Sequence, residues 1–174
     1  MNSSINQNKS KELNLYNNIL ILSRNKLFYT KFALADTFQN RINLIFFHIS
    51  FIFIKVNHKS EKNDYRNFYQ KLFDVLFKQI EINMRELGYG DVSVNKKMKF
   101  LVKSFYNILL FCESYNEKSS EYKKTFLKQY FQTKIEEKMP NSDNLINYFE
   151  LFQTFCFELS SDSVLKGELK FKFN

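Results

Sequence analysis

Residues that interrupt helices are scarce in this chain of 174 residues, which contains one proline and three glycines. An all-β domain needs many tight turns, and tight turns depend on Gly and Pro, so this scarcity argues against an all-β fold. Hydrophobic residues make up 44% of the chain, and its length suits one domain with a substantial core. The sequence therefore predicts an all-α, single-domain bundle of about six helices.

Cysteine and histidine are also scarce, with two of each. Cys112 and Cys156 lack the CxxC spacing of zinc or redox sites and lie in apolar helical patterns, where a free cysteine behaves as a small hydrophobe. Two histidines are too few for a histidine-based metal site. Gly88 and Gly90 follow a helical pattern rather than a strand and lack the other glycines of a phosphate loop. We therefore expect no metal and no cofactor.

The positions of the two histidines argue against catalysis. His48 lies inside an apolar helical pattern, and His58 lies at a polar end of the same region. A general base must reach a substrate proton, so we interpret His48 as a buried, hydrogen-bonded side chain. The sequence predicts no catalytic residues, and we expect that the protein is not an enzyme.

The longest hydrophobic run, Ile42–Val56, is too short and too polar to cross a membrane. It is bounded by Arg41 and Lys55 and includes Asn43, His48 and Ser50, whereas a span needs about 20 apolar residues. We expect instead a central buried helix over 37–56, capped by Asp36 or Thr37. The polar first residues lack the apolar core of a secretory signal, which indicates a cytoplasmic protein.

Five further segments carry apolar residues at three- and four-residue spacing. We expect helices over 13–25, 64–87, 93–112, 119–138 and 142–159. Gly88-Tyr89-Gly90 is expected to end one helix and Asp91 or Ser93 to cap the next, which predicts a helical hairpin over 64–112. Residues 28–32 form an aromatic connector. Residues 1–12 are a polar lead, 13–161 the domain, and 162–174 a tail that alternates apolar and basic residues without a pairing partner.

The formal net charge of +8 suits an anionic partner such as a ribosome, RNA or a membrane surface rich in acidic lipid. Basic residues are spread along the chain, with short clusters at 96–99 and 123–124. A solvated helix surface explains most of them.

One face of the 64–87 helix carries alternating charges one turn apart, at Lys71, Asp74, Lys78, Glu81 and Arg85. Each such pair contributes only about 0.2–0.5 kcal/mol when exposed, so this face is either a solvated ladder or a surface that binds a partner. Arg41 and His48 lie seven residues apart on one helix face and form a second candidate, although Arg41 can also pair with Asp36. The candidate partner-binding residues are Arg41, His48, Asp74, Lys78, Glu81, Arg85 and Asp91.

Three strings of residues resemble the ubiquinol-cytochrome c chaperone family. The first is Asp36-Thr37-Phe38-Gln39-Asn40-Arg41 followed by His48, and the second is Leu72-Phe73-Asp74. The most specific is Met84 to Val94, which runs Arg-Glu-x-Gly-x-Gly-Asp-x-Ser-Val, with the lysines that follow it and Phe105-Tyr106. Coverage extends from Leu15 to about Phe131. The family often has Gly at the position of Asn40, Pro at Asn95, and Gly-Arg at Asn107-Ile108.

The resemblance implies an all-α domain that assists assembly of the cytochrome bc1 complex. It implies binding of newly made cytochrome b, or of an early assembly intermediate, close to the membrane. For mitochondrial members it also implies a small partner protein and a contact with the ribosome.

Two other functions fit parts of the sequence. A basic helical module that binds RNA or ribosomes would show affinity that falls steeply with salt. An enzyme acting on an isoprenoid or quinone-like substrate in an aromatic pocket is the other alternative, but the sequence lacks paired carboxylates or a metal motif for it.

Overall fold

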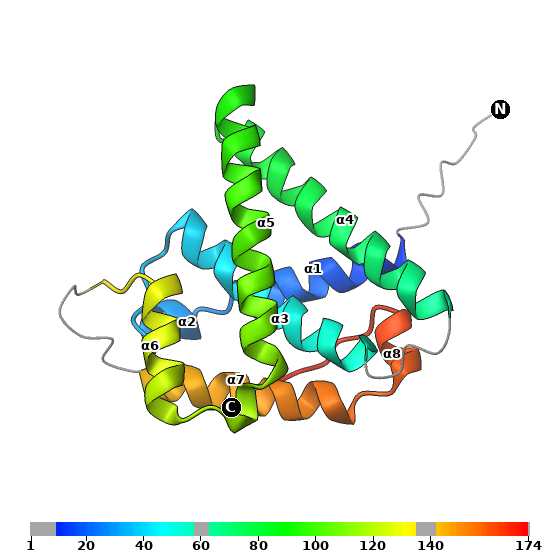
Figure 1. Cartoon of the computed structure of the whole chain (residues 1–174), viewed down its shortest axis with the longest axis vertical. Helices are drawn as coiled ribbons and strands as arrows, with labels where there is room; N and C mark the ends of the chain where they lie inside the picture. Colours follow the sequence, from blue (N-terminus) through cyan, green and yellow to red (C-terminus); the bar gives the residue numbers. More distant parts are fainter. Residues whose placement is uncertain (1–9, 58–62, 135–141, 174) are drawn as a thin grey trace.

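The structure, a computed structural model, describes residues 10–57, 63–134 and 142–173. The helices in this part of the chain are α1 (Lys11–Ser23), α2 (Leu27–Thr30), α3 (Phe38–Asn57), α4 (Asn63–Glu86), α5 (Asp91–Glu113), η1 (Tyr115–Glu117), α6 (Ser120–Tyr130), α7 (Ser142–Glu158) and α8 (Ser161–Leu165) (Figure 1). The predicted all-α fold is confirmed. The six predicted helices are present as α1 and α3–α7, and the short helix α2 overlaps the aromatic connector.

Helix α3 forms the centre of the molecule, as the apolar run predicted. Every residue from Ile42 to Val56 is buried, and α3 packs against α1, α4, α5 and α7. Thr37 is the cap, because its hydroxyl oxygen accepts the Asn40 N–H at 3.2 Å. Burying one large apolar side chain contributes about 1.5–3 kcal/mol, so this helix dominates the core. Of the helices that the structure describes, none is long and apolar enough to span a membrane.

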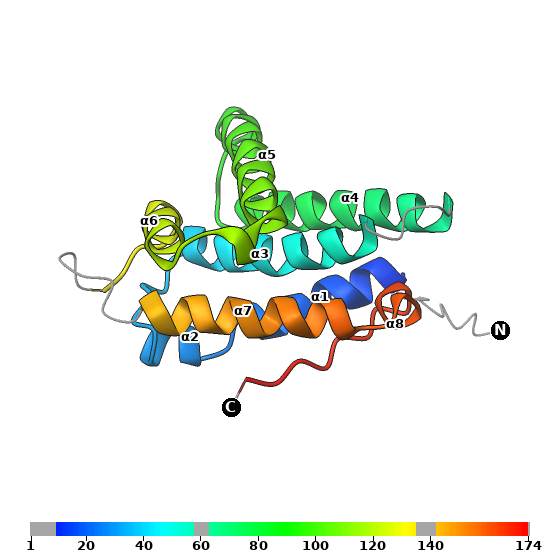
Figure 2. The same cartoon turned by 60° about the horizontal axis from the view of Figure 1, so that its bottom comes forward.

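The other helices form layers on both sides of α3. Figure 2 shows α1 and α7 on one side and the α4–α5 hairpin on the other, with α5 outermost. Helix α6 lies against α7, where buried Lys123 donates to Glu150 at 2.7 Å. Because α5 is the outermost helix on its side of α3, its outer side faces away from the body of the protein.

The α4–α5 hairpin turns at the paired glycines, as predicted. Tyr89 N–H donates to Met84 O at 3.1 Å and Gly88 N–H to Arg85 O at 2.9 Å, which together form a Schellman motif. This motif needs a left-handed residue, and Gly88 has a φ of +86°. The predicted cap of the next helix was wrong, because Gly90 is the N-cap and Asp91 is the first helical residue. The two helices meet at this turn and then diverge (Figure 1).

Helix α6 ends earlier than the sequence predicted. It stops at Tyr130, and residues 131–134 are not helical; the predicted end at 135–138, like His58, lies outside the described residues. The backbone here bonds to the segment before α3 instead, since Ala35 N–H donates to Gln132 O at 2.9 Å and Lys134 N–H to Ala33 O at 3.1 Å. Long-range pairing thus replaced the last helical turns.

The C-terminal segment is an extended arm packed on the core rather than a paired strand. Phe171 contacts the rings of Phe152 and Phe155, and Phe173 contacts Phe32. The arm begins at Gly167, where φ is +74° and an added Cβ would lie 2.7 Å from Lys11 O. Because the arm lies so close to α1 at this point, only glycine fits there.

Candidate functional site

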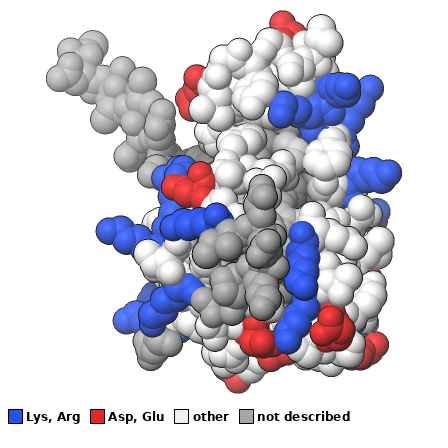
Figure 3. Space-filling view, turned by 90° about the vertical axis from the view of Figure 1, so that its left-hand side faces the viewer, with Lys and Arg blue, Asp and Glu red and all other residues white. Residues whose placement is uncertain are grey.

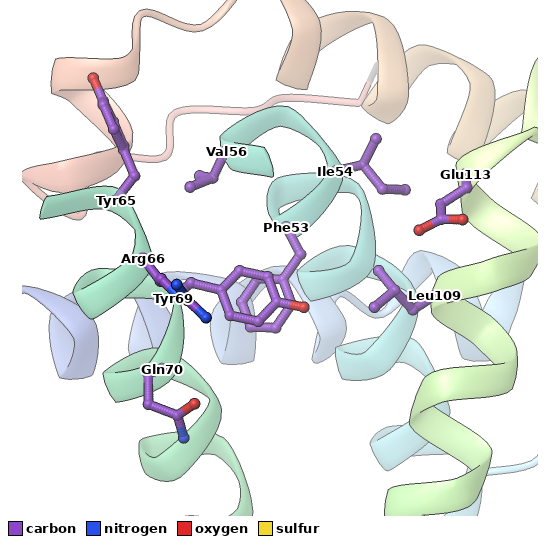
Figure 4. Close-up of a pocket in the computed structure, with 9 residues that line it drawn as sticks. All are labelled: Phe53, Ile54, Val56, Tyr65, Arg66, Tyr69, Gln70, Leu109 and Glu113. Carbon is purple, nitrogen blue, oxygen red and sulfur yellow. The ribbon is translucent and has the colours of Figure 1, made fainter. Parts of the chain in front are cut away.

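A groove opens where α4 and α5 diverge above the C-terminal half of α3. It has a volume of about 490 Å³, and Figure 4 shows its lining: Phe53, Ile54 and Val56 of α3, Tyr65, Arg66, Tyr69 and Gln70 of α4, and Leu109 and Glu113 of α5. Three helices supply these side chains. The groove therefore exists only because the hairpin splays apart on α3.

The groove combines an apolar floor with a charged rim. The rings of Phe53 and Tyr69 pack with centroids 3.7 Å apart, and Leu109 lies across from them on α5. Burial, together with nearby Tyr106 and Glu113, raises the pKa of Tyr69 to about 12, so its hydroxyl stays neutral. Arg66 and Glu113 are exposed on opposite walls. Such a site accepts apolar side chains and orients them by charge at the edges.

The charged face of α4 adjoins this groove. Asp74, Lys78 and Arg85 are exposed, and Glu81 is partly exposed. We call these four residues the α4 ridge. Gln70, which lines the groove, donates to Asp74 Oδ1 at 3.0 Å. The ridge thus begins at the edge of the groove and runs to the hairpin turn.

Arg85 joins three of the predicted residues into one ionic cluster. Its guanidinium bonds to Glu81 at 2.9 Å and to Asp91, the first residue of α5, at 2.5 Å. The side chains of Glu81 and Arg85 remain 42% and 46% exposed. These bonds raise the pKa of Arg85. The cluster braces the turn from outside and leaves its charges accessible to a partner.

Arg41 is exposed near the start of α3, outside the α4–α5 hairpin. Its guanidinium makes two bonds to the Asp36 carboxylate, at 2.7 and 2.9 Å, across the first turn of α3. The pairing with Asp36 is the alternative that the sequence left open. This ion pair lowers the pKa of Asp36. The Arg41 side chain is still 49% exposed, so its contact with a partner stays a prediction.

His48 cannot form the basic pair with Arg41 that the sequence suggested. It is completely buried, with Nδ1 2.6 Å from Leu44 O and Nε2 2.7 Å from the Tyr148 hydroxyl. Burial lowers its pKa to about 4, partly opposed by the bond to Leu44, so the ring is neutral near pH 7. Within the fold His48 is a core residue that connects α3 to α7. Because it is buried, His48 cannot contact an external partner.

The sequence did not reveal the groove residues. Phe53 and Leu109 fit the apolar patterns of two separate helices, and Tyr69 was not among the apolar positions predicted for a third. Periodicity cannot show that helices diverge above such positions. The interpretation of the cysteines as structural agrees with their burial, which raises the pKa of both thiols. Among the residues that the structure describes, no group of His, Cys, Asp and Glu is placed to hold a metal ion.

Comparison with known proteins points to one family. The sequence profile described as "Ubiquinol-cytochrome C chaperone" matches residues 30–171, so the match begins after the expected start at Leu15 and extends beyond the expected end near Phe131. The fold is similar to that of the Cbp3 homolog from Brucella abortus, with a TM-score of 0.79 and 24% identity over 94% of this chain and 89% of that one. Comparison with curated proteins found no match. From the match over most of its length, the chain belongs to the ubiquinol-cytochrome c chaperone family.

Proposed function

We propose that this protein is a non-enzymatic assembly chaperone for cytochrome b of the bc1 complex. Its client is newly made cytochrome b or an early assembly intermediate, held at the cytoplasmic face of the membrane. Membership of the family supports the assembly role. A small partner protein and a ribosome contact, implied for mitochondrial members, remain predictions for this chain.

The observation that carries this proposal is the groove bordered by the α4 ridge. A chaperone for a membrane protein forms and breaks no covalent bonds; it must cover apolar helix surface while charges set the direction of the bound segment. The groove supplies the apolar floor, and Asp74, Lys78, Glu81 and Arg85 supply charges along one side. We propose that an apolar helix of the client lies in the groove with a polar end against the ridge.

The first test reverses the charge at the centre of the ridge. Arg85→Glu should leave the core intact, because the side chain is exposed, but it places three carboxylates together at the hairpin turn. We expect recovery of cytochrome b with the tagged variant to fall about tenfold, a typical loss when a charged contact becomes repulsive. The measurement is co-purification from detergent-solubilised membranes.

Arg24→Glu is the matched control, since Arg24 is also exposed but follows α1. It changes the net charge equally and should recover cytochrome b like the unmodified protein. Unchanged recovery of cytochrome b with Arg85→Glu would show that the α4 ridge does not bind the client.

The second test changes the groove itself. Leu109 is partly buried on the α5 wall, and Leu109→Gln keeps its approximate size while making that wall polar. We expect cytochrome b recovery to fall about fivefold to tenfold, because an apolar contact is lost and a polar group is covered by the client. Leu151→Gln is the control, as Leu151 is an exposed leucine of α7. Equal recovery with both variants would contradict a role for the groove.

A further inference from the structure

The outer face of α5 is both basic and apolar. Val92, Lys96, Lys99, Lys103 and Leu110 follow at spacings of three, four or seven residues, so they form one stripe along the helix. Phe100 and Tyr106 flank this stripe on either side. All seven are exposed, and we call them the α5 outer face. Opposite them, the inner face of α5 packs on α3.

The exposed apolar side chains of this face are unusually accessible. Val92 is 85% exposed, and Phe100 and Leu110 are each 62% exposed. A single exposed apolar residue is common, but several on one helix face indicate a contact surface. Because α5 is the outermost helix in Figure 2, this face is open to a large, flat partner.

The charge of the face has one sign. Residues 92–112 contain four lysines and no Asp or Glu. Lys97 lies over the Tyr89 ring at 4.7 Å, which leaves Lys96, Lys99 and Lys103 on the outer face. The acidic residues at the two ends are Asp91, which is bonded to Arg85, and Glu113, which lines the groove. The upper end of the molecule in Figure 3 is the α4–α5 end of Figure 1, and Lys and Arg side chains lie there among uncharged ones at the upper right.

We infer that the α5 outer face docks on the surface of a bilayer that contains anionic lipid. Lysine ammonium groups would contact lipid phosphates, while Val92, Phe100 and Leu110 enter the boundary between headgroups and acyl chains. Lysine suits this arrangement because its long stem lies along the apolar layer while its charge stays in water. The inference shares with the proposed function only the location at a membrane, and does not depend on the identity of the client.

Two other occupants fit the face less well. RNA would contact the lysines and could stack on Phe100 and Tyr106, but aliphatic Val92 and Leu110 provide no stacking surface for bases. A second copy of the chain would bring the two sets of lysines against each other, which like-charge repulsion opposes. A bilayer interface accepts the charged and the aliphatic side chains together.

The test is sedimentation of the full chain with vesicles of phosphatidylcholine that contain phosphatidylglycerol, compared with vesicles of phosphatidylcholine alone. We expect the protein to sediment with the anionic vesicles and to stay in solution with the neutral ones. The combined variant Lys96→Glu, Lys99→Glu and Lys103→Glu should bind about a hundredfold more weakly, because each lysine near an anionic surface strengthens binding several-fold.

The matched control is Lys26→Glu, Lys71→Glu and Lys170→Glu, which changes the net charge equally at exposed positions outside α5. It should retain most of the vesicle binding. A third variant, Phe100→Ser with Leu110→Ser, should bind anionic vesicles about tenfold more weakly while keeping its lysines, because apolar insertion is lost. Circular dichroism checks that all three are folded.

Equal vesicle binding by the α5 lysine variant and its control would overturn the inference. A second result would also overturn the inference: transfer RNA displaces the vesicles, and its binding is unaffected by the two serine substitutions. This result would assign the face to nucleic acid. Loss of vesicle binding with full recovery of cytochrome b would support the α5 docking face independently of the client-binding groove.

Discussion

Acidification will lower the free energy of unfolding by about 3 kcal/mol as the pH falls from 6.5 toward 4, through His48 alone. The pKa of this ring is about 4 in the fold and 6.5 in a solvated histidine. Between these values the unfolded chain binds a proton that the folded protein excludes, so protons favour unfolding. The stabilisation is therefore complete above 6.5 and is lost as the pH falls through this window. Urea denaturation across the window measures it.

The physical cause is the surroundings of the ring. His48 is completely buried, and its neighbours include the aromatic ring of Phe152 with a centroid distance of 4.7 Å. One ring nitrogen faces Leu44 O and the other the Tyr148 hydroxyl, so neither partner supplies a negative charge. Burial also raises the pKa of Tyr148, which keeps that hydroxyl neutral. Neither of these two partners could act as a counter-ion for a protonated ring.

The comparison that isolates His48 is His48→Gln. Glutamine keeps a donor and an acceptor for the two partners but does not titrate between pH 4 and 6.5. It should be less stable than the unmodified protein at neutral pH and should lose much less stability on acidification. Other ionisable groups titrate in both proteins, so the difference between the two curves reports His48. If the two stability curves run parallel, the folded protein binds a proton at His48 as readily as the unfolded chain does.

Replacing Asn40 with alanine should destabilise the protein by about 2–3 kcal/mol, because it removes three hydrogen bonds at a buried site. The amide nitrogen donates to Ala35 O and Gln132 O, both at 2.7 Å, and the amide oxygen accepts Gln132 N–H at 2.9 Å. The side chain is completely buried, so a small apolar replacement leaves backbone groups without a partner. The midpoint and slope of urea denaturation measure the loss.

Asn95→Ala is the control for this substitution. Asn95 is exposed on α5, and alanine favours helix, so the change in stability should stay within about 0.5 kcal/mol. Amide hydrogen exchange adds a local readout, because Asn40 holds residues 132–134 beside the start of α3. Faster exchange at Ala35 and Lys134 is expected in Asn40→Ala. A loss no larger than in Asn95→Ala would show that Asn40 does not secure this junction.

The sequence predicted the parts of the fold that depend on short spacings. The central helix follows from an unbroken apolar run, and the hairpin turn follows from Gly88, because only a residue free to adopt positive φ closes a helix in this way. The exposure of the α4 ridge follows from the spacing of its charges. These are properties of a few consecutive residues, so they do not require knowledge of the rest of the molecule.

Two other predictions, the end of α6 and the pairing of His48 with Arg41, were wrong for a physical reason. Helix α6 stops at Tyr130 because the next backbone groups bond to residues 33–35 and to Asn40, about 90 to 100 positions earlier in the chain. His48 shares a helix face with Arg41 by spacing alone, but Tyr148 of α7 covers it. No local pattern reports such partners.

By itself the sequence determined the helical class, the buried central helix and the glycine turn, because local backbone preferences and apolar periodicity act over a few residues. Only the tertiary structure decided that α4 and α5 diverge over α3 to open a groove, that Arg85 bonds to both Glu81 and Asp91, and that α5 presents its lysines with bare apolar side chains. These features depend on the angles at which helices pack. Those angles are set by side chains brought together from distant parts of the chain.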